Sequence, residues 1–230
     1  LNEYVHTDGS MPLFNGANNN YTNMIYDSLA KEEYLKSRLF SNIQNGIALY
    51  TDKQKKVFFD VVQPNKDTIS THLSAGTLSF ELSSGEEKII TNCGASESFG
   101  KNPEYLRYSA AHSTIVLQNT NISEIKENNP HIKFPQLVKF NLIENDSDSS
   151  FEGLHNGYIK KFKKIIKRKL IISKKENKLS GEDSFIPTKN TLERFIFHIR
   201  FHLMDGISFN FTNNKKNVIL KTKLNNIWIF

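Results

Sequence analysis

The sequence predicts a mostly β protein, an antiparallel β-sandwich that follows one short helical segment. From residue 43 onward apolar residues recur at every second position, the period of a strand that buries one face. Short turn-forming stretches separate these runs, and no helix is assigned between them. Strands that follow one another through short turns favour antiparallel sheets packed face to face.

The first forty residues have a different pattern. DGS and NGANNN, within residues 8–20, are rich in Asn and Gly and predict a loop. Thr22 or Asn23 is suited to cap a helix that runs to about Arg38, with one apolar side. A single amphipathic helix needs a packing partner, so we expect residues 1–40 to end a preceding helical domain and residues 41–230 to form the β domain.

The strands of the β domain are predicted from their alternation. Residues 43–50 and 57–62 are expected to form a hairpin around the polar turn TDKQKK. TLSFEL at 77–82 should turn Leu78, Phe80 and Leu82 inward, and Gly85 should lead into a strand over 88–92. Further strands are expected at residues 113–118, 137–143, 158–175 and 192–204.

The positive charge is concentrated in one stretch. The chain has a net charge of +6, and residues 151–180 hold ten Lys and Arg against two Glu. The run YIKKFKKIIKRKLIISKK at 158–175 fits an amphipathic helix or a half-buried β-ribbon, and periodicity alone leaves both open. Its lysines suit a solvated sheet face or a surface for a polyanion. Nucleic-acid binding is the least favoured reading because the lysines have no interleaved exposed aromatic residues.

Other classes of protein are excluded by composition. The single cysteine, Cys93, rules out an intrachain disulfide and a zinc site built from several cysteines. No apolar run approaches the ~18 residues that a membrane-spanning helix needs. The sequence begins without Met or a signal-peptide pattern, and we expect it to be a piece of a longer protein.

Histidine and arginine mark the candidate chemistry. As one strand, ERFIFHIRFHL would place Arg194, His198, Arg200 and His202 on a single face, opposite a row of Phe, Ile and Leu. This cationic rail fits either an ordinary basic strand or a groove for carboxylates, which the forked guanidinium group binds well. Three more histidines precede or follow strands: His72, His112 and His155.

Several stretches resemble the central β-sandwich domain of the heparinase II/III-like polysaccharide lyases. They are DGSMPLFNGA at 8–17, HLSAGTLSFELSSGEEKIITNCGA at 72–95, LRYSAAHSTIVL at 106–117, GLHNGY at 153–158, LSGEDSF at 179–185 and IRFHL at 199–203. They occur in the family's order. The resemblance implies an α/α toroid before the sandwich, an active cleft between the two, and β-elimination on a uronic-acid polysaccharide.

The resemblance also assigns site residues. His72 matches the first position of the family's H-x-H pattern and would be the sandwich's catalytic histidine, while the acid/base Tyr and another His belong to the toroid. His155, Tyr158, Arg200, His202 and Asn92 are the residues expected to contact substrate.

Zinc is not expected, although the family carries it. Of the ligand positions only His112 is kept, since Ser74 and Asn92 stand where the family has His and Asp. Zinc needs three or four good donors. We therefore expect no cofactor.

Two functions follow from the resemblance. The first is part of a bacterial polysaccharide lyase that acts on an acidic polysaccharide with the missing toroid of the same chain. The second is a non-catalytic sandwich that binds anionic glycan. In either case the isolated chain should bind without turnover.

Overall fold

The computed structural model describes residues 4–17, 40–44, 46–63, 73–95, 104–125, 134–189 and 194–230. In these ranges the chain is mostly β, as predicted, and its longest α-helix is α2, Ile159–Phe162. No helix in the same ranges is long and apolar enough to cross a membrane. The predicted helix over residues 22–38 and the candidate catalytic residue His72 lie outside the described residues.

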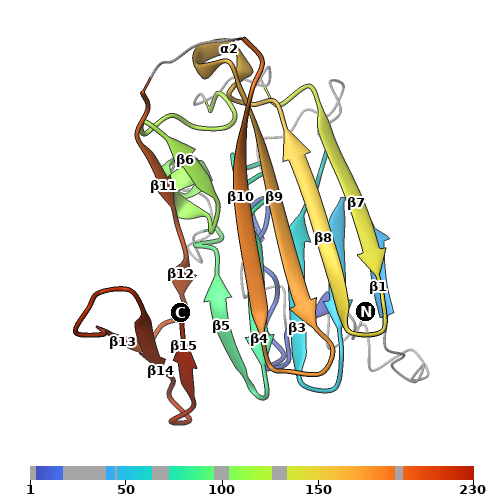
Figure 1. Ribbon diagram of the computed structural model, residues 1–230, viewed down its shortest axis with the longest axis vertical. Helices are drawn as coiled ribbons and strands as arrows, with labels where there is room; N and C mark the ends of the chain where they lie inside the picture. Colours follow the sequence, from blue (N-terminus) through green and yellow to red (C-terminus); the bar gives the residue numbers. More distant parts are fainter. Residues whose placement is uncertain are drawn as a thin grey trace.

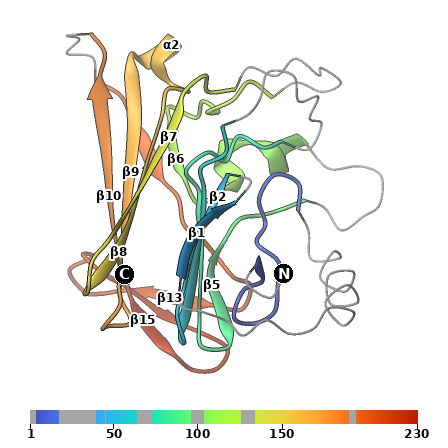
Figure 2. The same cartoon turned by 90° about the vertical axis from the view of Figure 1, so that its right-hand side faces the viewer.

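Two antiparallel sheets face each other (Figures 1 and 2). The six-stranded sheet has the order β1 (Phe40–Gln44), β2 (Ile47–Thr51), β3 (Lys55–Asp60), β4 (Phe80–Ser84), β5 (Glu87–Thr91) and β12 (His202–Leu203). The four-stranded sheet has the order β10 (Leu179–Pro187), β9 (Lys164–Ser173), β8 (Asp148–His155) and β7 (Val138–Glu144). The antiparallel sandwich is therefore confirmed.

Smaller elements extend the sandwich. β11 (Phe197–Ile199) pairs with β6 (Ile115–Leu117), and β13 (Ser208–Phe211), β14 (Val218–Lys221) and β15 (Ile227–Ile229) form a three-stranded sheet. Two 3-10 helices, Glu104–Arg107 and Ser109–Ala111, precede β6.

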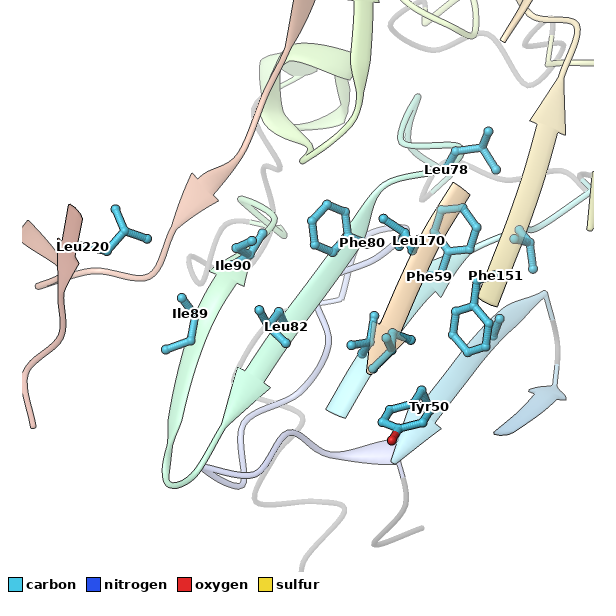
Figure 3. Packing of buried hydrophobic residues seen from close by; sticks show 14 residues of the cluster. Tyr50, Phe59, Leu78, Phe80, Leu82, Ile89, Ile90, Phe151, Leu170 and Leu220 are labelled. Atoms are coloured by element: carbon cyan, nitrogen blue, oxygen red, sulfur yellow. The ribbon is translucent and has the colours of Figure 1, made fainter. Parts of the chain in front are cut away.

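The main core lies between the two large sheets (Figure 3). Val57 and Phe59 of β3 and Phe80 and Leu82 of β4 face Phe151 and the apolar residues of β9. The alternation of these strands explains the arrangement, since every second side chain points between the sheets. Phe59 stacks on Phe151, with ring centroids 6.4 Å apart.

The outer face of the six-stranded sheet is covered as well. Residues 4–17 cross it as a third layer, without strand or α-helix (Figure 2). Phe14 packs on Leu49 and Phe58, and His6 meets the Phe58 ring edge-on at 4.6 Å. All five residues of β4 are therefore buried, although its pattern alone predicts one solvated face.

Two predicted strands are divided in the structure. Residues 43–50 were predicted as one strand, but Gly46 has φ +80° and turns the chain from β1 into β2. Residues 192–204 were also predicted as one strand, and this is wrong for the described part, 194–204. Here β11 pairs with β6, and after Arg200 and Phe201 the chain joins the six-stranded sheet as β12. The cationic rail is therefore not one continuous strand face.

The basic run is a β-ribbon after the short helix α2. In β9 the residues alternate between buried and partly exposed positions. Lys167 and Lys169 lie on the partly exposed side, while Lys164 and Arg168 are buried. The ribbon interpretation of residues 164–173 is confirmed, but two of its cations point inward.

Close approach of the sheets leads to a stability prediction. A Cβ on Gly153 would lie 2.4 Å from Leu78 Cδ2 and 3.1 Å from the Phe59 ring. We expect Gly153→Ala to lower the free energy of unfolding by about 1–3 kcal/mol, because the core must shift to admit the methyl group. Urea denaturation measures the change.

Gly181→Ala is the matched control in the neighbouring part of the same sheet. Its added Cβ would meet Leu170 Cδ2 at 3.7 Å, an ordinary contact. Both substitutions reduce the flexibility of the unfolded chain alike, so their difference isolates the packing effect. Equal stability of the two variants would contradict the close approach of Gly153 and Leu78.

Candidate functional site

Asn92 follows β5 and lies at the centre of a hydrogen-bonded cluster. Its Nδ2 donates to Glu81 Oε1 at 3.1 Å, and its Oδ1 accepts from the Ser113 amide at 2.8 Å. The Cys93 amide donates to the Ala111 carbonyl at 3.0 Å. These bonds bring the end of β5 beside the segment that precedes β6, so Asn92 and His112 lie together although β5 and β6 belong to different sheets.

His112 is a buried, neutral histidine. Its ring packs against Gly76, where an added Cβ would lie 2.9 Å from Cγ of the ring. Burial, with a smaller contribution from the neighbouring His202, lowers the pKa of His112 to about 4. Neither ring nitrogen has a hydrogen-bond partner among the described residues. This ring is therefore uncharged near neutral pH.

His202 is oriented by a backbone carbonyl and half-buried. Its Nε2 lies 2.9 Å from the Ala110 carbonyl oxygen, which only accepts, so the Nε2 nitrogen carries the proton. The bare Nδ1 then faces Cys93 Sγ at 3.8 Å. Burial lowers the pKa of His202, the Ala110 hydrogen bond opposes this, and the charge of Arg200 lowers it again. The bare Nδ1 can accept a proton, and it can donate a hydrogen bond only once it is protonated.

Arg200 supplies a fixed cation next to His202. Its backbone amide donates to the Thr114 carbonyl at 3.0 Å, which anchors the chain where it passes from β11 to β12. The Nε of Arg200 has no hydrogen-bond partner among the described residues. His198 is exposed and lies two residues before Arg200. The basic residues His198, Arg200 and His202 therefore remain close in sequence despite the break in the strand. Arg200 and His202 suit a carboxylate ligand.

His155 and Tyr158 lie in the interior, close to each other. Their ring centroids are 5.7 Å apart, and they are 0% and 1% exposed. Tyr158 donates its hydroxyl proton toward the carbonyls of Ile115 and Thr120, at 3.1 and 3.0 Å. Burial lowers the pKa of His155 to about 3, and the charge of Arg168 contributes. Both side chains support the packing of β6 and α2.

The residues at the family's zinc positions do not fit zinc. Both ends of the Asn92 amide are already engaged, by Glu81 and by Ser113. Ser74 offers only a hydroxyl group, so His112 would be the single good donor. Within the described ranges no group of three or more His, Cys, Asp or Glu side chains is placed to hold a metal ion.

A separate groove of about 420 Å³ opens between the large sheets near the C-terminal strands. Phe201, Trp228 and Phe230 line it, together with the ion pair of Arg168 and Asp183. Its lining is mainly apolar, and the pair is satisfied within the protein. The groove is therefore less suited to an acidic glycan than the Arg200–His202 surface.

Two residues of the cluster were not predicted from the sequence. Glu81 and Ser113 join Asn92 to the rest of the cluster, but sequence patterns placed Glu81 on a solvated strand face. A buried carboxylate is costly unless paired. The only sign of pairing in the sequence is Lys88 across the β4–β5 hairpin.

The comparisons with known proteins agree with this architecture. The family described as "Heparinase II/III-like, C-terminal" matches residues 37–230. No curated protein sequence matches significantly.

Solved structures match the fold at low identity. Heparan sulfate lyase HepC from Pedobacter heparinus has a TM-score of 0.72 at 15% identity, covering 99% of this chain and 37% of that protein. A heparinase III structure gives 0.70 at 14% identity, covering 99% and 38%. The heparinase III BT4657 gene product gives 0.66 at 11%, covering 94% and 35%. The chain thus spans little more than a third of these relatives. With the family match over most of its length, the chain belongs to the heparinase II/III-like family, in the part that the family's C-terminal model describes.

Proposed function

We propose that this chain is the sandwich part of a polysaccharide lyase that cleaves a uronic-acid-containing polysaccharide by β-elimination. The observation that carries the proposal is the family match over residues 37–230. The partly exposed Arg200–His202 surface supports it, because a polysaccharide with a carboxylate on each uronic acid needs a cationic surface.

The roles follow from the chemistry of elimination. A base removes the proton beside the uronate carboxylate, a cation stabilises the charge that develops, and an acid protonates the glycosidic oxygen as its bond to carbon breaks. Arg200 and His202 are proposed to bind the carboxylate. His72 remains the proposed catalytic group of the sandwich, on the resemblance alone. Asn92, His155 and Tyr158, being buried, would shape the site from behind.

A preceding toroid is proposed to supply the remaining acid and base. The three groups must be held together in near-attack geometry for turnover. The chain by itself should therefore bind acidic oligosaccharides and leave them intact. A longer protein that includes the toroid should release unsaturated uronate, which is detected by its ultraviolet absorbance.

Binding to this chain provides the direct test. Heparan sulfate oligosaccharides should bind with an affinity that falls as salt rises. Arg200→Ala should weaken binding by about tenfold or more, because a hydrogen-bonded ion pair contributes about 1.5–3 kcal/mol. Calorimetric titration at two salt concentrations measures both effects.

Arg194→Ala is the matched control, since it removes the same charge from an exposed side chain. Six residues of extended chain place it about 20 Å from Arg200. Equal losses in the two variants would mean that only net charge matters. If the longer protein binds uronate polymers and cleaves none of them, the binding-module function replaces the lyase. Absence of binding by the wild-type chain would reject both.

A further inference from the structure

Glu81 is a fully buried carboxylate near the start of β4, on the face that residues 4–17 cover. Its two oxygens have different partners. Oε2 receives the His6 ring at 2.7 Å and the Lys88 ammonium at 3.0 Å. Oε1 receives the Leu13 amide at 3.1 Å and both nitrogens of Asn92, at 2.8 and 3.1 Å. Oε2 therefore binds His6 of the N-terminal segment and the counter-charge Lys88. Oε1 binds Leu13 of the same segment and also Asn92.

The carboxylate is charged in this environment. Burial alone would raise the pKa of Glu81, but the Lys88 charge and the His6 hydrogen bond outweigh it and hold the pKa at about 2. An ionised carboxylate only accepts hydrogen bonds, so the Asn92 amide must turn its NH₂ group toward Glu81. The carbonyl end of that amide is thereby directed at the Ser113 backbone.

Ser113 connects Asn92 to His202 through hydrogen bonds. Its hydroxyl group donates to the Thr91 carbonyl at 2.7 Å and accepts from the His202 amide at 2.9 Å. With its backbone fixed there, His202 reaches the Ala110 carbonyl through its ring. A continuous series of hydrogen bonds thus joins Glu81 to the partly exposed histidine of the candidate site.

We infer that Glu81 is a positioning residue of the candidate site: it orients Asn92, and through Ser113 it holds His202 in place for an acidic ligand. The inference rests on the proposed function for the ligand, but not for the geometry. Because the same carboxylate binds His6 and Leu13, the site also depends on the N-terminal segment staying on the sheet.

The decisive variant is the double substitution Glu81→Met with Lys88→Met. Exchanging a buried ion pair for apolar residues of similar volume is often neutral for folding, while Asn92 loses its acceptor. Hydrogen exchange and NMR titration, without glycan, report on the His202 amide and ring. We expect exchange of this amide to accelerate by about tenfold or more and the ring pKa to move toward its ordinary value. Oligosaccharide affinity should fall in parallel.

Lys88→Met is the control, because it disturbs only the Oε2 side of the carboxylate. It should lower the melting temperature while the His202 amide and ring stay as in the wild type. Asn92→Ala should reproduce the effects of the double variant on His202, and adding it to that variant should cause little further change. A purely structural Glu81 would change the melting temperature and leave His202 unaltered, which would overturn the inference. Failure of the wild type to bind glycan would reject the proposed function alone, since the His202 measurements need no ligand.

Discussion

Replacing Arg168 with methionine is expected to lower the free energy of unfolding by about 3–5 kcal/mol, the largest single effect that the structure predicts. The Arg168 side chain is 2% exposed and binds Asp183 through two parallel bonds, at 2.7 and 2.9 Å. Its remaining nitrogen donates to the carbonyls of Leu78 and Ser113, at 3.0 and 2.9 Å. The substitution would leave a carboxylate and two carbonyls without their donors.

Urea denaturation of three variants separates the contributions. Lys167→Met, the control, removes the next cation along β9, whose bond to Glu152 at 2.9 Å is partly exposed and contributes about 0–1 kcal/mol. Arg168→Met with Asp183→Leu should recover part of the loss, because no uncompensated charge remains. If Arg168→Met costs no more than Lys167→Met, the guanidinium does not hold the two sheets together.

Arg168 also shows where sequence-based prediction ends. The pattern of residues 158–175 fitted a helix as well as a ribbon, and as a ribbon it was expected to turn its cations to solvent. The partners of Arg168 lie 15, 55 and 90 residues away, on β10 and on the segments before β6 and β4. No local pattern encodes contacts of that range. The sheet architecture was predictable because alternation is local, while the direction of one buried cation depended on the assembled fold.

The candidate site was predictable to a similar extent. Residue types pointed to Arg200 and His202, and both lie at the surface beside Asn92 and His112. The change of sheet after β11 was missed because it is set by pairing with β6 and β5, not by the sequence of residues 194–204 itself. Glu81 was missed for the same kind of reason. A carboxylate on an alternating strand is expected to face solvent. The sequence pattern does not show that another segment, here residues 4–17, covers it.

Acid is expected to destabilise the protein before most of its carboxylates titrate. His6, His112 and His155 are buried, and burial lowers the pKa of each, to about 4 for His112 and about 3 for His155. For His6 the Glu81 hydrogen bond partly offsets burial. In the unfolded chain the same rings take up protons near pH 6.5. Below that pH the unfolded state binds more protons, so stability falls with pH.

Asp60 acts in the opposite direction. Burial raises its pKa to about 7, against a hydrogen bond from the Val62 amide that lowers it. Between about pH 6 and pH 4.5 the folded state therefore holds one proton that the unfolded state lacks, against two on the unfolded His112 and His155, and His6 adds to the histidine side. The balance of about one proton predicts a loss of at least about 1.4 kcal/mol per pH unit, since one proton corresponds to about 1.4 kcal/mol. Domains are stable by about 5–15 kcal/mol, so this loss removes a sizeable part of the stability before ordinary carboxylates titrate below about pH 4.5.

Three variants test the balance through the slope of unfolding free energy against pH, measured by urea denaturation. His155→Phe removes one buried histidine and should reduce the slope by about 1.4 kcal/mol per pH unit. Asp60→Asn keeps the acceptor for Val62 but no longer takes up the opposing proton, so its slope should steepen by a similar amount. His198→Gln is the matched control, because its side chain is exposed in both states and its loss should leave the slope unchanged. A slope equal to the wild type in His155→Phe would mean that this ring is protonated in the folded protein, and the interior around Tyr158 would then have to admit water.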